Sequence, residues 1–539
     1  MNNKNFSISH VFELILLTTL FLLCASFYAS FDPSEMRTFG IFPWDSGVYR
    51  DLAGKFASDY SGQLVGRYPF GTRILFPYLY GNLSGITGVS FADAAYYVNL
   101  SSSLLVVIFC FYFWRHHGVS RIVAWMGIIL FMFSWLGPIR YSGYYPGGSF
   151  AFEMFLVSSL YIVLSLTSPK MNPLLLLLAA MVIFALTCGK EVVTYILLLA
   201  LLTKYLAFNF RGGFGSLIPS RRYFIQTALQ SLKSRSYSSM IVYFLASVSG
   251  YVFTHTLVHN DGGKYSVVNT VSKFAWFHLN PVEFLYPFFY ALGPFVLCLL
   301  LVLSFKKTRA AFFRAIGNNF PHSDLIVIFS ASGVIFCMVG GTDSDRFLLW
   351  FFPFLALFCL KALDALVEYR HWRINFSLLT IFIIGLMWSR FYVPAIPHLF
   401  FPGYFYNSFA GVKTNLDPAL YYGPAFMQGY RKPLKDVPLG EAYAGKVIDS
   451  PSRLPKDPPR ISSDLEKEAA TGNRFKGSYK FDVNTIPFPF GYPHNQYEFL
   501  TDHPFHGDRG IRITLLMQWL SAYLFLILFN RKRLAQSSG

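Results

Sequence analysis

The chain has 539 residues, of which 54% are hydrophobic, 19% aromatic and only 14% charged, and its formal net charge is +17. This composition is typical of an integral membrane protein and excludes a single large water-soluble domain. The six cysteines all lie in apolar stretches, and the long polar segment 395–510 has none. The sequence therefore predicts neither a disulfide framework nor a cysteine-based metal site.

Hydrophobic stretches of about 20 residues recur along the chain and predict about twelve transmembrane helices, because that length crosses a bilayer. No small-residue cleavage site follows the first stretch, so we interpret it as a retained helix. The predicted fold class is an all-α polytopic membrane protein. Its expected spans are 11–31, 93–114, 119–138, 148–167, 173–188, 191–208, 240–258, 284–304, 323–340, 346–367, 374–394 and 511–529.

The basic residues orient these spans. With a cytoplasmic N-terminus, strict alternation places the whole formal charge of +17 on the cytoplasmic side and leaves the outer side balanced. Both termini are then cytoplasmic, as the positive-inside rule expects. We interpret the basic segments 209–239 and 305–322 as topology signals and contacts with anionic lipids, in preference to nucleic-acid sites.

Three parts follow from this arrangement. Residues 1–394 form the transmembrane core, including a first outer loop at 32–92 in which short surface helices are expected over 45–60 and 71–86. Residues 395–510, between the last two spans, are expected to form a small outer domain. Residues 511–539 form the last transmembrane helix and a basic cytoplasmic tail.

Polar and ionisable residues gather on the outer side, where such groups are costly unless they face a polar cleft or a partner. We therefore expect one cleft that opens outward. Its candidate residues are Asp45, Tyr49, Arg73, Arg140, Glu153, Lys190, Glu191, His255, Asp343, Asp345 and Arg346.

The chemistry of these residues suits group transfer from a lipid phosphate. A carboxylate such as Asp45 can accept the proton of an acceptor hydroxyl. Arg73, Lys190 and Arg346 can bind a phosphate, since guanidinium donors match its oxygens and lysine adds a point charge. A phosphate held in this way leaves without protonation, and no metal or other cofactor is indicated.

Structural roles compete with these functional ones. Asp45 suits the N-cap of a surface helix beginning at Ser46. Arg73 suits a side chain that extends to the lipid headgroups. Lys190 and Glu191 suit a pair that neutralises itself.

The remaining candidates have similar alternatives. Asp343 and Asp345 can pair with Arg346 and stabilise a tight turn. His255 and His259 have the i, i+4 spacing of two metal ligands on one helix, but the sequence fixes no third ligand.

Four segments resemble the C-type (GT-C fold) integral membrane glycosyltransferases. Trp44-Asp45-Ser46-Gly47-Val48-Tyr49 is similar to their aspartate-containing first outer loop, and Pro69-Phe70-Gly71-Thr72-Arg73-Ile74-Leu75-Phe76-Pro77 to the arginine-centred surface helix that follows in many bacterial members. Lys190-Glu191 is similar to their basic–acidic pair at an outer turn. Asp345-Arg346-Phe347-Leu348-Leu349, with Pro353 beyond, is similar to their late span. The resemblance covers about residues 10–395.

The resemblance implies inverting sugar transfer from a polyprenyl-phosphate donor to a periplasmic glycan, lipid or protein, in a bacterial inner membrane. It implies that Asp45 is the general base, and the donor phosphate is expected at Arg346 and Lys190, with Arg73. Many relatives carry an aspartate near the second outer loop, where this chain has only Glu153. The segment 395–510 is expected to cover the cleft and select the acceptor.

Two other classes of protein share some of these features. A transporter or flippase of a lipid-linked glycan also needs cations in a membrane cavity, but it should place them along a path that reaches both faces. A membrane acyltransferase or glycan polymerase/ligase can also use the cations. An acyltransferase is expected to use a histidine base deep in the core, and none is well placed.

Overall fold

The computed structural model describes residues 8–31, 45–58, 62–66, 69–132, 137–143, 148–168, 171–209, 237–260, 288, 292, 295–317, 321–339 and 344–370. These residues are mostly helical, which confirms the predicted helical architecture. In chain order the elements are α1 (Ile8–Phe31), α3 (Asp45–Ala57), β1 (Leu64–Gly66), the 3-10 helix η1 (Phe70–Thr72), α4 (Leu75–Thr87), α5 (Phe91–His116), α6 (Arg121–Met132), α7 (Pro138–Gly143), α8 (Phe150–Leu166), α9 (Pro173–Gly189), α10 (Val192–Asn209), α12 (Tyr237–Leu257), β2 (Val258–Asn260), α15 (Phe295–Ser304), α16 (Lys306–Gly317), α17 (Ser323–Val339), α18 (Ser344–Trp350) and α19 (Phe352–Arg370).

Each predicted span up to residue 367 contains a described helix. Among the described residues, α5 and α12 are long and apolar enough to cross a bilayer by length and composition, and several other apolar helices are shorter. The spans 374–394 and 511–529 and the segment 395–510 lie outside the described residues. The total of about twelve spans therefore stays a prediction.

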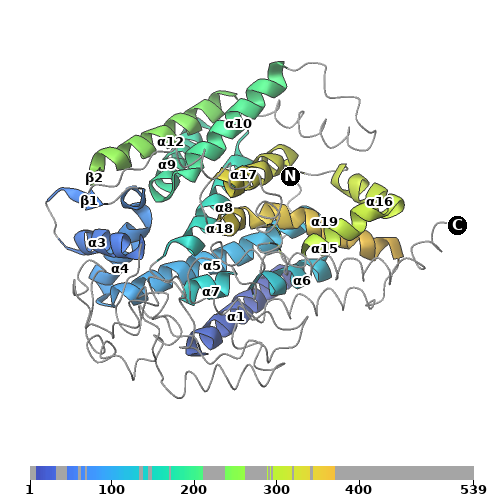
Figure 1. Ribbon diagram of the computed structural model, residues 1–539, viewed down its shortest axis with the longest axis horizontal. Helices are drawn as coiled ribbons and strands as arrows, with labels where there is room; N and C mark the ends of the chain where they lie inside the picture. The colour runs from blue at the N-terminus through green and yellow to red at the C-terminus, as the bar shows by residue number, and fades with distance from the viewer. Residues whose placement is uncertain are drawn as a thin grey trace, which may run out of the picture.

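Helix α5 lies at the centre of the bundle. It packs against α8, α7, α4, α6, α1 and α19, and Figure 1 shows it between α8 and α18 on one side and α1 and α6 on the other. On α5, the buried Trp114 donates its indole N–H to the carbonyl of Pro353 in α19, at 2.9 Å. Aromatic rings from α5, α8, α17 and α19 fill the space between these helices, at Phe113, Tyr161, Phe329 and Phe354. These contacts fix the central helices on which the outer end is built.

The expected span 346–367 is divided into two helices. Helix α18 ends at Trp350 and α19 begins at Phe352. At this break the N–H of Phe351 donates to the carbonyl of Leu348, and the N–H of Phe354 to that of Phe351, each at 3.1 Å. Pro353 explains the break, because proline lacks an N–H and its ring collides with the preceding turn of a continuous helix.

The first outer loop forms a compact layer. A Cβ atom on Gly81 of α4 would lie 2.5 Å from the carbonyl oxygen of Ala53 in α3, so glycine permits the close packing of these two helices. Strand β1 pairs in parallel with β2, with Leu64 opposite Val258. This pairing, which the sequence analysis did not predict, ties the loop to the end of α12.

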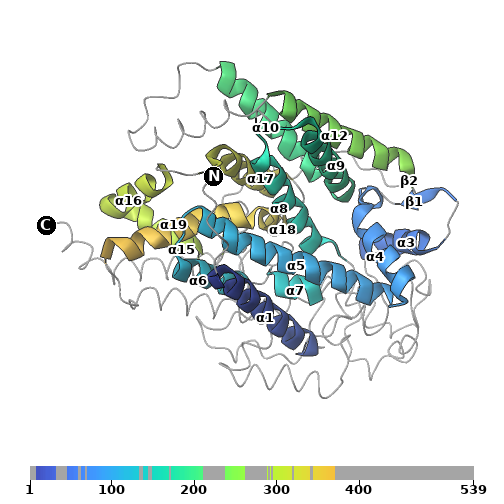
Figure 2. The same cartoon turned by 180° about the vertical axis from the view of Figure 1, so that it is seen from behind.

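The first outer loop and the basic segment 305–322 lie at opposite ends of the bundle. Figure 1 and the reverse view in Figure 2 show α3, α4, β1 and β2 at one end, and α16 with the ends of α6 and α19 at the other. The candidate polar residues of the first outer loop are thus distant from the basic helix α16.

Candidate functional site

Arg73 lies where the first outer loop turns into α4. The preceding residues form η1, in which the Thr72 hydroxyl donates to the carbonyl of Pro69 at 2.8 Å. The Arg73 guanidinium binds both oxygens of Glu191, with Nη2 2.6 Å from Oε1 and Nε 3.1 Å from Oε2. Only 12% of the Arg73 side chain is exposed. Arg73 is therefore directed into the protein by a two-point ion pair, in contrast to the headgroup anchor considered from the sequence.

Lys190 forms a second ion pair with a different partner. It follows α9 in an extended backbone conformation, and its Nζ donates to Oε1 of Glu153 at 2.8 Å. Both side chains are buried, at 4% and 1% exposure. The ammonium also lies 4.7 Å from the ring centre of Trp350 in α18, within the range of a cation–π contact. Lys190 and its neighbour Glu191 are thus each paired across the bundle.

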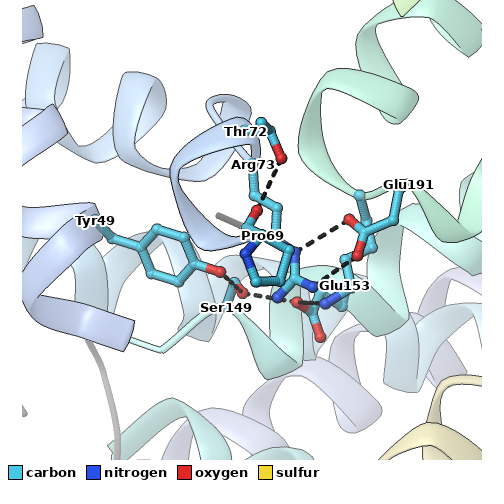
Figure 3. A network of polar contacts seen from close by, with 8 residues as sticks. Tyr49, Pro69, Thr72, Arg73, Ser149, Glu153 and Glu191 are labelled. Atoms are coloured by element: carbon cyan, nitrogen blue, oxygen red, sulfur yellow. Dashed lines mark hydrogen bonds and ion pairs between the residues drawn. The ribbon is translucent and has the colours of Figure 1, made fainter. Parts of the chain in front are cut away.

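A chain of hydroxyl groups connects this pair to α3. The Ser149 hydroxyl, one helical turn before Glu153, donates to Oε1 of Glu153 at 2.8 Å. The same hydroxyl lies 3.4 Å from the hydroxyl of Tyr49, which is buried in α3. Figure 3 shows the labelled side chains of Tyr49, Ser149, Glu153, Arg73 and Glu191 converging from separate elements. We call Tyr49, Ser149, Glu153, Lys190, Arg73 and Glu191 the ionic network.

Electrostatic attraction favours the charged forms of Arg73 and Glu191. Burial alone would raise the pKa of Glu191, but the charges of Arg73 and Lys190 lower it to about 2. Burial also opposes the charge on Arg73, and the nearby Glu191 carboxylate still raises the pKa of Arg73 well above its ordinary value. Burial and the charge of Arg73 lower the pKa of Lys190, against the attraction of Glu153. The network thus brings two basic and two acidic side chains together in two pairs.

The helices place two further candidates next to the network. Asp45 is the first residue of α3, one helical turn before Tyr49. Arg346 lies in α18, one helical turn before Trp350. Residues four apart occupy neighbouring positions on one helix face. The side chains of Asp45 and Arg346 are outside the described part of the structure, and the helix begins at Asp45 instead of the expected Ser46.

Three other candidates are placed by backbone alone or not at all. Arg140 lies in α7 and Asp345 in α18, and neither side chain is described. Asp343 lies outside the described residues.

The histidines do not form the ligand pair suggested by their spacing. His255 is in the last turn of α12, and its Nδ1 is 2.8 Å from the carbonyl of Tyr251. Helix α12 ends at Leu257, and His259 lies in β2 opposite Val65, so the two histidines do not share a helix face. No group of three His, Cys, Asp or Glu side chains that could hold a metal occurs among the described residues.

Two residues of the site, Ser149 and Trp350, were not predicted from the sequence. Ser149 had a signal, because serine commonly precedes the first residue of a helix. Trp350 directly follows the Asp345–Leu349 segment, but its apolar surroundings resemble ordinary helix packing. Nothing in the sequence indicates that its ring contacts Lys190.

The low pKa of Glu191 predicts a pH dependence. A carboxyl whose folded pKa is depressed from 4.5 to about 2 stabilises the fold fully above its unfolded pKa, and this contribution is lost as the pH falls from about 4.5 toward 2. The melting temperature of the Glu191→Gln variant should therefore lie below that of the wild type by a constant amount between pH 8 and pH 5. Thermal unfolding in detergent measures this difference. Narrowing of the difference between pH 7 and pH 5 would contradict the prediction.

Comparison with known proteins gives matches to solved structures alone. No protein-family model matches the chain, and no curated protein does. The chain is similar to the Archaeoglobus fulgidus oligosaccharyltransferase tethered to an acceptor peptide with an NVT sequon (13% identity, TM-score 0.45, covering 87% of this chain and 63% of that chain). It is also similar to the oligosaccharyltransferase AglB of the same archaeon in complex with an inhibitory peptide and a dolichol-phosphate (12% identity, TM-score 0.43, covering 86% and 64%).

The chain thus spans less than two thirds of the length of these matched structures.

Proposed function

We propose that this protein is an inverting GT-C-type glycosyltransferase that moves a sugar from a polyprenyl-phosphate donor to an acceptor hydroxyl in the bacterial periplasm. One observation carries the proposal: the helix of Asp45 and the helix of Arg346 meet at the same buried ionic network, through Tyr49 and Trp350. Two helices from distant segments, one beginning at Asp45 and the other containing Arg346, thus contact one network.

In this proposal Asp45 accepts the proton of the acceptor hydroxyl. The acceptor oxygen attacks the anomeric carbon while the bond from that carbon to the phosphate oxygen breaks, and polyprenyl phosphate leaves with the bonding electrons. A single displacement of this kind inverts the configuration of the sugar carbon. Its barrier falls where fixed positive charge faces the departing phosphate.

Arg346 supplies the larger share of that charge, because the other two cations are already paired. Glu191 occupies Nε and Nη2 of Arg73, and Glu153 accepts one hydrogen of the Lys190 ammonium. A guanidinium has five N–H donors and an ammonium three, so both retain donors for a phosphate oxygen. Arg73 and Lys190 therefore act as additional phosphate contacts whose positions the carboxylates fix.

The sidedness of the proposed reaction follows from charge. The site lies at the end of the bundle opposite the basic helix α16 (Figure 1). If the basic end faces the cytoplasm, as the positive-inside rule expects, the site faces the periplasm of an inner-membrane protein with cytoplasmic termini. The segment 395–510 then covers the site and selects the acceptor.

A donor-cleavage assay tests the proposal. The full chain in nanodiscs would receive polyprenyl-phosphate sugars and an envelope extract, and released polyprenyl phosphate would be measured. We expect release, with a loss of about 10²–10³-fold in the Arg346→Gln variant, typical of removing a group that stabilises developing charge. Arg309→Gln, which removes an exposed cation from α16, should retain the wild-type rate.

A transporter gives a different result in the same system. It moves intact donor between leaflets without breaking the sugar–phosphate bond. Transbilayer movement of donor with no polyprenyl phosphate released would overturn the proposal in favour of the flippase.

A further inference from the structure

Helix α16 has one buried face and one basic face. Thr308, Phe312 and Ile316, spaced four residues apart, are buried. Phe312 and Ile316 belong to the main hydrophobic core, and the helix packs against α15 and α19. Their spacing places these three side chains on one stripe of the helix. This stripe holds α16 against the bundle.

The other face carries exposed cations. Lys306, Arg309 and Arg314 are exposed, and Ala310 lies between them on the same face. The sequence of α16, KKTRAAFFRAIG, contains no acidic residue. No ion pair joins these three cations to a carboxylate within the described part of the chain. Lys306 and Arg309 are three residues apart and repel each other, so an anionic partner is electrostatically favourable here.

The position of α16 indicates what that partner is. The helix starts directly after α15, an apolar helix of one of the expected spans, and a bend at Phe305 separates the two. The Thr308 hydroxyl fixes this bend by donating to the carbonyls of Val302, at 2.9 Å, and Phe305, at 3.1 Å. The basic face therefore begins where an apolar helix leaves the bilayer, at the depth of the lipid headgroups.

Two acidic residues near this end of the bundle already have partners of their own. His117 of the turn after α5 contacts the carbonyl of Pro321 beside α17, which places the two turns together. Of the acids there, Glu13 pairs with Arg121, and Asp364 accepts from the backbone N–H of Ser120. The exposed surface of α16 is thus left with a net positive charge.

We propose that α16 lies in the membrane interface and that its exposed face binds the headgroups of anionic phospholipids. The phosphate groups of these lipids approach Lys306, Arg309 and Arg314 while the apolar stripe stays on the bundle. This binding is independent of the proposed sugar transfer, because the site lies at the other end of the molecule.

Lipid retention by the purified full chain tests this inference. Native mass spectrometry would count phosphatidylglycerol and phosphatidylcholine molecules that stay bound after detergent release. We expect the wild type to prefer phosphatidylglycerol, and the Lys306→Gln/Arg309→Gln/Arg314→Gln variant to lose roughly tenfold or more of that preference at low salt. High ionic strength should weaken the preference of the wild type toward that of the variant.

A matched variant distinguishes lipid binding at the exposed face of α16 from a general effect of net charge. Arg431→Gln/Lys432→Gln/Lys435→Gln removes the same charge from the segment 395–510, which is expected on the outer side, and should retain the preference. Added glycerol phosphate should not displace the lipid, since the proposed ligand is a headgroup held in a membrane.

Three outcomes would overturn the inference. The α16 variant could retain as much phosphatidylglycerol as the wild type, in which case these cations serve only as topology signals. Equal loss in both triple variants would show a general charge effect. Displacement by glycerol phosphate would identify a soluble anion site. A monodisperse elution profile and an unchanged melting temperature establish that each variant is folded.

Discussion

Replacing Asp45 with Asn is expected to lower the rate of sugar transfer by about 10²–10⁴-fold, the usual contribution of a general base. The expected change is in kcat, because the substitution removes the proton acceptor and leaves the phosphate contacts in place. Initial rates of polyprenyl phosphate release in nanodiscs, measured at several donor concentrations, provide the test.

Asparagine is the informative substitution because it also caps helices well. If Asp45 only begins α3, Asp45→Asn should retain the wild-type rate. Asp51→Asn is the matched control, since Asp51 is an exposed carboxylate on the same helix. An equal loss of rate in both variants, or more than half of the wild-type rate in Asp45→Asn, would remove Asp45 as the base.

The Lys190–Glu153 ion pair should have the largest effect on stability. Breaking a buried pair by removing one partner leaves an uncompensated charge and costs about 3–5 kcal/mol. Lys190→Met and Glu153→Gln are each expected to reduce the free energy of unfolding by this amount, since both side chains are almost fully buried. Chemical unfolding in detergent, followed by circular dichroism, measures the loss.

The double variant distinguishes a charge effect from simple loss of packing. Removing both charges leaves no unpaired ion, so Lys190→Met/Glu153→Gln should be more stable than the sum of the single effects predicts. The Arg121–Glu13 pair serves as a comparison, because the Arg121 side chain is 55% exposed. Glu13→Gln, which leaves the Arg121 guanidinium in contact with water, should cost no more than about 1 kcal/mol. Strict additivity at Lys190 and Glu153 would contradict the interpretation.

The helices were predictable from sequence, and the pairing of the charged residues was not. Apolar stretches of sufficient length predict helices whatever their neighbours, and the proline at 353 even marks the break between α18 and α19. In contrast, Lys190 pairs with Glu153 across 37 residues, and Arg73 with Glu191 across 118. The spacing of nearby residues contains no information about partners that are so far apart in the sequence.

The same reasoning explains why two local predictions differ from the structure. Lys190 and Glu191 were considered as a self-neutralising pair because they are adjacent, but each has a partner on another element. His255 and His259 were considered as i, i+4 residues, but the helix stops at Leu257, between them. Both alternatives assumed that the contacts of a residue are made with its neighbours in the sequence.

The pairing of β1 with β2 has a consequence for biosynthesis. Leu64–Gly66 leave the ribosome long before Val258–Asn260, and the parallel pair requires both. The first outer loop can therefore complete this pairing only after the intervening helices α4 to α12 have been made. Contacts between such distant segments form late because closing a long loop costs chain entropy. A nascent chain released before residue 260 would contain every residue of the ionic network but would lack this closure of the first outer loop.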